Sequence, residues 1–324
     1  MKRAMAMLLV LAMLLGLVPV TATAAQDAGI PADAAASESI PTFTDTDAVV
    51  TEIRESMIRR QRQIQVRLNG QSLTSSQVYD LFREARAHNG VPNQGDYIRA
   101  NMVGYSYSVA TGTDAGGVYS QITIECDFIS DAAMEAEVDA AVAQLLNELD
   151  LWDASNYEKV KGVYDWITEN VEYDYEWDDL EDDTGEYEHS THAALIRRSA
   201  VCQGFASLYY RLLLELGVDC RYISGDAVDI TGSERHGWNI VYLDGKYYNC
   251  DPTWDRSLMG HYRYFLCTES SFSEHVRDAE FDTAQFHAQY PMAITPYVQN
   301  ATASGCTASI MKCEREKRKT VSVI

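Results

Sequence analysis

Apolar residues recur along this chain with two different periods, and the change from one period to the other marks its segments. In the first half they are spaced as in amphipathic helices or alternate as in half-buried strands. The expected elements are a helix from Asp47, a strand over residues 64–68, a helix over 78–82 and two paired strands over 97–109 and 118–128. Glycines between 112 and 117 would supply the turn of the last pair. We therefore predict a small α/β domain over residues 47–129, and the pattern assigns no role to it.

The pattern over residues 130–290 predicts a second domain, in which helices come first. Asp131 is a candidate N-cap, and Ser155–Glu158 has the sequence of a capping box ahead of another helix. A strongly amphipathic helix opens around Cys202, and Gly217 is the residue that would end it. Strand-like alternation follows this helix, so the predicted fold class of the domain is α+β.

The two ends of the chain differ from the rest in composition. Residues 1–25 combine a basic start, a long apolar run and a small-residue cleavage pattern over 22–24, which is typical of a secretory signal peptide. Residues 26–46 are rich in Ala, Ser, Asp and Pro and predict a flexible linker, and residues 291–324 are interpreted as a tail. We expect a protein that is secreted or displayed at the cell surface, with no stable membrane span after signal cleavage.

Acidic residues dominate the charge of the chain. The formal net charge is −22 at pH 7, which would repel phosphate backbones and excludes nucleic acid as an expected partner. Ten carboxylates stand between Glu172 and Glu188, in a stretch that we interpret as a solvated loop. If this loop lies over a substrate site, its field would favour lysine-bearing peptides over acidic ones.

Two groups of residues raise the question of a metal. The acid-rich stretch lacks the ligand spacing of an EF-hand loop, so calcium is not expected there. A zinc site could be assembled from His189, His192 and Cys202, but an H-x-x-H pair without the intervening Glu is a poor signal for zinc. We therefore predict neither a metal nor another cofactor. The chain has seven cysteines, and sequence alone cannot choose their pairing.

Cys202 is the cysteine whose surroundings favour reactivity. It would lie in the first turn of its helix, where the helix dipole and free backbone N–H groups stabilise an anion and so favour the thiolate. A structural cysteine at a helix start would show the same local pattern. Cys202 therefore needs a partner elsewhere in the chain before it can be interpreted as a nucleophile.

A predicted hairpin downstream supplies a histidine–carboxylate pair. Asp244-Gly245 is typical of a two-residue type I′ turn, which places Leu243 opposite Lys246. In that register His236 and Asp251 are diagonal neighbours on one face, about 7–8 Å apart between backbones. Their side chains can meet across this gap. A carboxylate that holds a histidine in one tautomer is the orienting element of a nucleophilic triad.

These residues lie in motifs that resemble the transglutaminase-like superfamily, and the resemblance covers roughly residues 156–281. The matching motifs are Ala200-Val201-Cys202-Gln203-Gly204-Phe205, His236-Gly237-Trp238-Asn239 and Asp251-Pro252-Thr253-Trp254-Asp255. The chain looks like a bacterial exported member with a Cys202–His236–Asp251 triad. The resemblance implies a papain-like core, in which the Cys202 helix packs on an antiparallel sheet that carries the other two residues. It also implies an acyl-enzyme at Cys202.

Other site residues are assigned on thinner grounds. Animal members of the family use a tryptophan upstream of the nucleophile for the oxyanion, and Trp177 or Tyr175 could take that part here. Trp238 and Trp254 are candidates for the wall of the cleft, and core packing is the alternative for both. The short aromatic run from Tyr262 to Cys267 resembles the final strand of bacterial members.

We therefore interpret the chain as a cysteine-dependent acyltransferase or peptidase that acts on extracellular peptide or protein amides. Cell-wall peptide is one candidate substrate. The sequence does not distinguish hydrolysis from transfer to an amine, because this depends on which nucleophile reaches the thioester. The alternative is a non-catalytic peptide- or wall-binding module that keeps the same fold.

Overall fold

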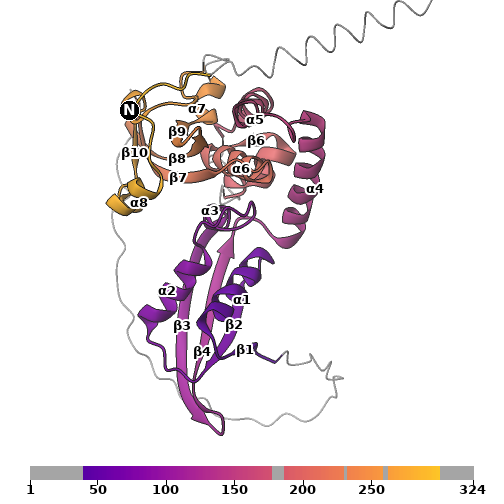
Figure 1. Cartoon of the computed structure of the whole chain (residues 1–324). Coiled ribbons are helices and arrows are strands. Elements are labelled where there is room, and N and C mark those ends of the chain that lie inside the picture. The colour runs from indigo at the N-terminus through magenta and orange to yellow at the C-terminus, as the bar shows by residue number, and fades with distance from the viewer. Residues whose placement is uncertain (1–38, 177–185, 230–231, 258–261, 300–324) are drawn as a thin grey trace, which may run out of the picture. The chain divides into compact units, whose positions relative to one another are not determined.

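Two four-stranded sheets organise the described part of the chain (Figure 1). The computed structural model describes residues 39–176, 186–229, 232–257 and 262–299. The predicted signal peptide, most of the predicted linker, the middle of the acid-rich stretch with Trp177, and the tail from residue 300 lie outside the described residues. No helix within the described ranges is long and apolar enough to cross a membrane.

The first sheet has the order β1-β2-β4-β3 and belongs to the predicted small domain. Its strands are β1 (Thr42–Phe43), β2 (Gln63–Asn69), β3 (Met102–Asp114) and β4 (Gly117–Phe128), and its helices are α1 (Thr46–Ile58) and α2 (Ser75–Ala85). Every second residue of β2 is buried, as the alternation predicted. These buried residues form one apolar core with α1 and α2. The predicted helices and strands of this region are therefore confirmed, with three differences in detail.

One difference is the strand β1, which lies inside the segment predicted to be a flexible linker. Thr42 and Phe43 pair in parallel with Arg67 and Leu68 of β2. Two residues are too few to produce an alternation pattern, and their pairing depends on β2.

A second difference concerns residues 97–100, which were predicted to begin a strand. They belong to the short helix α3 (Asp96–Ala100). Gly95 stands before this helix with φ +57°, and a Cβ atom at this position would come within 2.7 Å of the His88 backbone. Glycine therefore allows the sharp entry into α3. Tyr97 and Ile98 are fully buried, because the helix packs into the protein instead of extending the sheet. The third difference is the β3–β4 turn, which is tighter than the predicted 112–117.

Three helices precede the second sheet and surround its core. They are α4 (Ala132–Leu149), α5 (Asn156–Asn170) and α6 (Cys202–Glu215), with the short parallel strands β5 (Glu172–Tyr173) and β6 (Ser199–Ala200) between the last two. The side chain of Asp131 caps α4, and Ser155 and Glu158 form the predicted capping box. Gly217 follows the end of α6 with φ +75°, as expected for a residue that ends a helix.

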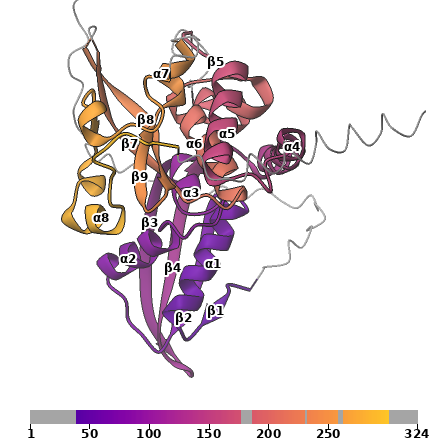
Figure 2. The same cartoon turned by 45° about the horizontal axis from the view of Figure 1, so that its top comes forward.

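The second sheet is antiparallel, has the order β10-β7-β8-β9 and supports α6 (Figures 1 and 2). Its strands are β7 (Cys220–Asp229), β8 (Gly232–Leu243), β9 (Lys246–Cys250) and β10 (His275–Arg277), and the helices α7 (Pro252–Ser257) and α8 (Ala284–Gln289) follow β9 and β10 in the chain. Leu243 pairs with Lys246, so the hairpin register predicted from Asp244-Gly245 is confirmed. The predicted α+β class with a cysteine helix packed on an antiparallel sheet is confirmed as well.

The aromatic run from Tyr262 to Cys267 is not the final strand, as its resemblance had suggested. Tyr262 and Leu266 have φ values of +46° and +54°, in the left-handed region that a continuous strand does not use. Only Cys267 forms a β-bridge, with Asn249. The last strand of the sheet is β10, on the opposite edge.

Contacts cross the predicted border between residues 129 and 130. Arg221 of β7 donates two hydrogen bonds to the buried Asp96 carboxylate of α3, at 2.6 and 3.1 Å. Tyr97 belongs to the apolar core that also contains α4, α5 and α6. The described residues from Ile40 to Gln299 accordingly belong to one compact unit.

Candidate active site

Cys202 is the first residue of α6, and the start of this helix is open. No side chain caps it at Val201, so the first backbone N–H groups of the helix face the site. The segment before the helix is fixed, because the Val201 N–H donates to the Glu188 carbonyl at 2.9 Å. Cys202 itself is half-buried. The predicted position of the thiol at a helix N-terminus is therefore confirmed.

Gly204 allows the first turn of α6 to lie against this segment. A Cβ atom at position 204 would come within 2.7 Å of the Ala200 Cβ and 2.9 Å of the Ser190 carbonyl oxygen. Both distances are below ordinary van der Waals contact. The Gln-Gly sequence after the cysteine thus reflects close packing beneath Cys202 rather than a need for an unusual φ angle.

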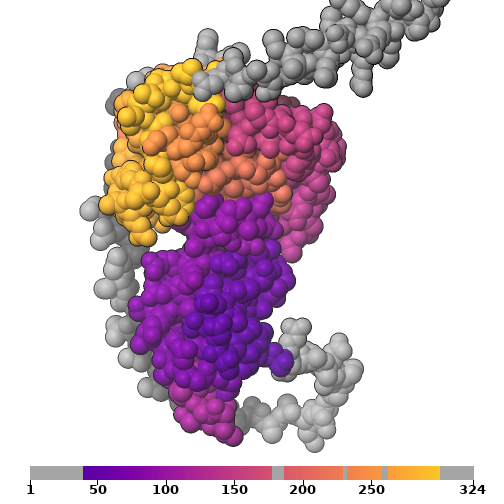
Figure 3. All heavy atoms as spheres, in the orientation of Figure 1, coloured from indigo at the N-terminus to yellow at the C-terminus, as the bar shows by residue number. Residues whose placement is uncertain are grey.

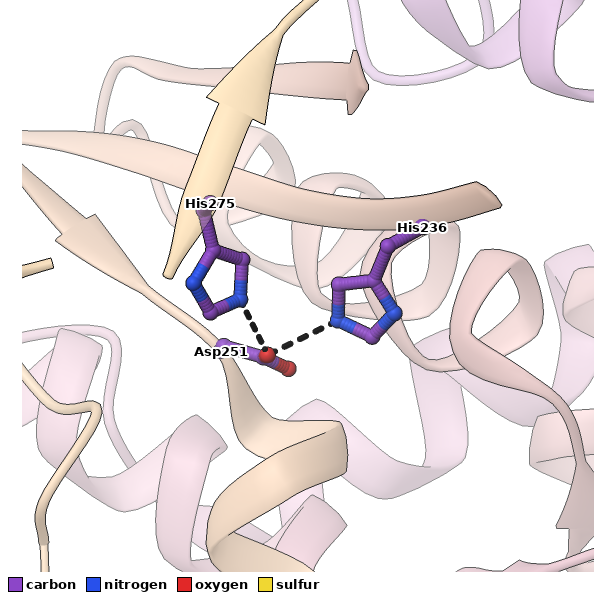
Figure 4. Close-up of side chains that lie close together, drawn as sticks. All are labelled: His236, Asp251 and His275. Carbon is purple, nitrogen blue, oxygen red and sulfur yellow. Dashed lines mark hydrogen bonds and ion pairs between the residues drawn. The ribbon is translucent and has the colours of Figure 1, made fainter. Parts of the chain in front are cut away.

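His236 on β8 meets Asp251, which directly follows β9, as the hairpin register predicted. The His236 Nε2 and Asp251 Oδ2 atoms are 2.8 Å apart, and both side chains are buried (Figure 4). Because Nε2 bonds the carboxylate, Nδ1 is the ring atom left for Cys202. The Cys202 side chain lies close enough to His236 to contribute to the raised pKa of its imidazole. The three predicted residues therefore come together in the order Cys202, His236, Asp251.

Asp251 also binds a second histidine, which the sequence reasoning missed. His275 of β10 lies with its Nε2 at 3.0 Å from the same Oδ2 atom (Figure 4). The other oxygen, Oδ1, accepts the backbone N–H groups of Thr253 and Trp254 at 2.9 and 3.2 Å. Four donors thus hold the carboxylate. No sequence signal marks His275, since it lies 24 residues beyond Asp251 on a three-residue strand.

The ring of His275 is clamped between aromatic side chains. It stacks on Phe272 with centroids 3.8 Å apart and lies 4.5 Å from the Trp254 ring. Its Nδ1 is buried without a hydrogen-bond partner among the described residues. This fits a ring with a proton on Nε2, the atom that bonds Asp251, because a proton on Nδ1 would be left without an acceptor.

Burial and neighbouring charges have opposite effects on the pKa values of His236 and Asp251. Burial disfavours a charged imidazole, yet the Asp251 carboxylate and the Cys202 side chain raise the pKa of His236 to about 10. For Asp251, burial alone would raise the pKa, but His236 and His275 hold it well below its usual range. The arrangement therefore stabilises an imidazolium next to an ionised carboxylate, which is the charge state that supports a thiolate nucleophile.

The other described cysteines are unlike Cys202. Cys126, Cys220, Cys250 and Cys267 are buried free thiols. Burial raises the pKa of Cys126 and of Cys267 to about 11, and it raises the pKa of Cys220 and Cys250 further. Cys306 and Cys313 lie outside the described residues.

Of the two oxyanion candidates, Trp177 lies outside the described residues, and Tyr175 is largely exposed. The Tyr175 ring lies tilted against the Tyr173 ring, with ring centroids 4.8 Å apart. It is Tyr173 that lies near the nucleophile, since burial and the Cys202 thiolate both raise its pKa. The same two causes raise the pKa of Tyr222 on β7. The Tyr173 and Tyr222 side chains thus lie near enough to Cys202 to interact with its charge, and the oxyanion role of Tyr175 stays a prediction.

The structure separates the two tryptophans proposed as cleft walls. Trp238 is fully buried in an apolar cluster behind His236, so its assignment to the cleft wall was wrong, and the alternative of core packing holds. The reason is its position on the inner face of β8, where its Nε1 donates to Asn249. Trp254 is half-buried, with its ring 5.5 Å from that of His236. It stays a candidate for the wall.

The zinc alternative finds no support in the arrangement of His192. Its two ring nitrogens lie at hydrogen-bond distance from Tyr187 and Glu137. In the described ranges, the ligand atoms that gather closely enough for a metal ion are those of His236, Asp251 and His275, which lie within 4.8 Å of one another. The hydrogen bonds to Asp251 account for this spacing.

Comparison with known proteins places this site in a family context. The model of the Transglutaminase-like superfamily matches residues 143–252, a range that includes Cys202, His236 and Asp251. Kyphoscoliosis peptidase of Mus musculus is 27% identical over 136 residues, which are 40% of this chain and 20% of that protein. The Homo sapiens protein of the same name is 26% identical over 140 residues, 41% of this chain and again 20% of that protein.

The chain thus spans about a fifth of the length of the curated relatives it matches. Among solved structures, a crystal structure of a TGase is similar with a TM-score of 0.31 and 14% identity, over 66% of this chain and 59% of that chain.

Proposed function

We propose that this chain, whose residues 143–252 match the model of the transglutaminase-like superfamily, forms an acyl-enzyme at Cys202 with an amide of a peptide or protein. One observation carries the proposal. A buried His236–Asp251 pair, with an imidazolium favoured up to about pH 10, lies beside a thiol at an open helix start. A surface ion pair on a hairpin would not explain the burial of both groups or their position next to Cys202.

The reaction follows from the order of these groups. The Cys202 thiolate attacks the amide carbonyl carbon, and the negative charge moves to the carbonyl oxygen, where backbone N–H groups of the α6 N-terminus can receive it. The Tyr173 and Tyr222 hydroxyls are further donors near this position. His236 then gives its Nδ1 proton to the leaving nitrogen as the C–N bond breaks, which leaves a thioester on Cys202.

The second half of the reaction regenerates the thiol. His236, now neutral, takes a proton from the incoming water or amine as this nucleophile attacks the thioester carbonyl. Collapse of the tetrahedral intermediate expels the thiolate and restores the imidazolium. Water gives a peptidase or amidase, and an amine gives a crosslinking transferase. The proposal covers both hydrolysis and transfer to an amine, because the same side chains would serve each reaction.

The setting proposed for this reaction is outside the cytoplasm. It rests on the signal-peptide pattern of residues 1–25, which lie outside the described residues. The substrate would then be an extracellular peptide or protein.

The experiment traps the covalent intermediate. Purified protein is mixed with a pool of peptides that carry both glutamine side chains and backbone amides, quenched with acid and analysed by intact and peptide-level mass spectrometry. We expect an acyl adduct on Cys202, and either shortened peptides or, with a labelled primary amine present, amine-bearing peptides. The Cys202→Ala variant is the control. Equal turnover by this variant would overturn the proposal.

A further inference from the structure

A polar cavity opens at the first turn of α6, the helix that begins with Cys202. Its volume is about 530 Å³, and its lining includes Gln203, the residue that follows Cys202, together with Tyr222 of β7. The Tyr222 hydroxyl lies against Gly237, the residue after His236, where a Cβ atom would approach it within 2.6 Å. The cavity wall therefore includes the residue that follows Cys202 and a tyrosine that contacts the residue after His236. A substrate bound in this cavity would lie against the first turn of α6, one residue from Cys202.

The opposite wall of this cavity belongs to the small domain of residues 47–129. Arg86, which follows α2, and Arg99 and Ala100 of α3 line it. The Gln203 side chain donates to the Ala100 carbonyl, so α3 and the first turn of α6 are directly bonded. The small domain, to which the sequence assigned no role, thus forms half of the cavity next to Cys202.

A second cavity of about 490 Å³ continues the first. It shares Arg86, Arg99 and Tyr105 with it and extends between α2 and the region of α8, where Tyr290 lies. In Figure 3 the surface is hollowed between the violet α2 region and the yellow C-terminal region. Two adjoining cavities of this size can hold an extended peptide segment rather than a single side chain.

Arg86 is the exceptional charge in this groove. Neighbouring arginines are neutralised: Arg99 pairs with Glu280, and Arg221 pairs with Asp96. For Arg86, no carboxylate of the described residues lies within ion-pair distance. Burial lowers the pKa of this guanidinium below its ordinary value, as expected for a desolvated cation that lacks an anion.

The Arg86 guanidinium is also held in place. It lies over the Phe82 ring at 4.0 Å and over the Tyr105 ring at 4.8 Å from the centroids, and its Nε donates to the Phe82 carbonyl. Aromatic stacking fixes the plane of the fork that a carboxylate would meet. A fixed, half-buried arginine loses little conformational entropy when it binds an anion.

We propose that this groove binds the acyl-donor peptide and that Arg86 selects donors that carry a carboxylate near the reactive amide. The inference rests on the proposed function and names its substrate class. It is opposite to the expectation of a lysine preference from the acid-rich stretch of residues 172–188. A direct ion pair in a half-buried cavity outweighs the field of exposed, screened carboxylates.

The binding test does not depend on turnover. Labelled peptides are titrated into the Cys202→Ala protein, and binding is followed by fluorescence anisotropy. Three matched peptides are used: one with a glutamate side chain and an amidated C-terminus, one with glutamine there and a free C-terminus, and one with neither carboxylate. We expect the Kd of either the glutamate peptide or the free-C-terminus peptide to be at least tenfold lower than that of the peptide without a carboxylate. Which of the two binds more tightly shows whether Arg86 recognises a side-chain or a C-terminal carboxylate.

The groove is then tested with Arg86→Gln in the Cys202→Ala background. We expect this change to remove the tenfold difference. Arg59→Gln is the matched control, since it removes the same charge from the same small domain at an exposed ion pair with Glu52, outside both cavities. It should leave the difference unchanged. Melting curves of both variants show whether they fold.

The outcomes separate this inference from the proposed function. Equal Kd values for all three peptides, or a carboxylate preference that survives Arg86→Gln in a folded protein, would overturn the inference. An acyl adduct on Cys202 could still form in either case, and the proposed function would stand. Carboxylate-dependent binding without any adduct would support the groove and contradict the catalytic proposal.

Discussion

His275 and Asp251 are bonded at 3.0 Å through the carboxylate oxygen that also bonds His236. The carboxylate that orients His236 is therefore itself oriented by a residue from the opposite edge of the sheet, on β10. His275 does not reach Cys202 in this arrangement, so we interpret it as a positioning residue that acts through Asp251.

The bond from His275 is expected to affect kcat rather than KM. The His275→Phe variant keeps an aromatic ring stacked on Phe272 but loses the donor, whereas His275→Gln keeps a donor. Since a hydrogen bond to a charged group contributes about 1.5–3 kcal/mol, kcat should fall at least tenfold in His275→Phe with little change in KM. His275→Gln should recover most of the loss. Equal kcat in a folded His275→Phe protein would remove His275 from the mechanism.

Cys202 should be the first thiol to react with iodoacetamide at neutral pH. The other described cysteines are buried, and burial raises the pKa of each of them. Mass mapping after brief labelling identifies the modified residue. Alkylation of Cys126 or Cys267 ahead of Cys202 would count heavily against the triad.

The Asp251→Asn variant should fold and yet lose turnover. The amide cannot stabilise the His236 imidazolium, and it presents a donor where the carboxylate accepted, so the tautomer is lost as well. We expect kcat to fall by a factor on the order of 10³–10⁴. Steady-state rates on a substrate of the wild type, with a melting curve of the variant, provide the measurement. Retention of more than a tenth of the activity would exclude Asp251 from the mechanism.

The pH profile should show the raised pKa of His236. In the folded protein the imidazolium persists to about pH 10, so kcat/KM should decline only above that value. The same shift stabilises the folded state: this contribution is fully present below pH 6.5 and is lost as pH rises toward 10. The melting temperature of the wild type should therefore fall more over this interval than that of Asp251→Asn. Parallel curves for the two proteins would contradict the assignment.

The packing beneath the nucleophile can be tested at Gly204. The Gly204→Ala variant would bring a methyl group within 2.7 Å of Ala200 and 2.9 Å of a carbonyl oxygen, and overpacking of this kind costs about 1–3 kcal/mol. We expect a lower free energy of unfolding and lower activity. Gly116→Ala is the control, because its new methyl group would meet only the Asp114 side chain, at 3.3 Å. Equal denaturation midpoints for both variants would show that α6 can move away.

The sequence predicted the His236–Asp251 pair because the pair depends on local geometry. A two-residue turn fixes the register of the hairpin, and the register decides which side chains share a face. His236 and Asp251 could therefore be joined without knowledge of the rest of the fold. Cys202 required only its own helix and the matching motifs.

What the sequence did not predict depends on contacts between distant segments. His275 reaches Asp251 only because β10 pairs with β7, and three residues are too few to produce a periodic signal. Tyr97 alternates with its neighbours like a strand residue, but burial of α3 against the catalytic core decides its conformation. The burial of Trp238 likewise depends on residues that arrive later in the chain.

The bond between Arg221 and Asp96 also bears on how such proteins can diverge. Removing one partner of a buried ion pair typically costs 3–5 kcal/mol, because the other charge stays buried without compensation. If a gene lost or exchanged the region that encodes α3, the Arg221 guanidinium would therefore stay buried at β7 without its carboxylate partner. We therefore expect the region that contains α3 and the region that contains β7 to be inherited together. Substitutions at Asp96 and Arg221 should be correlated in evolution.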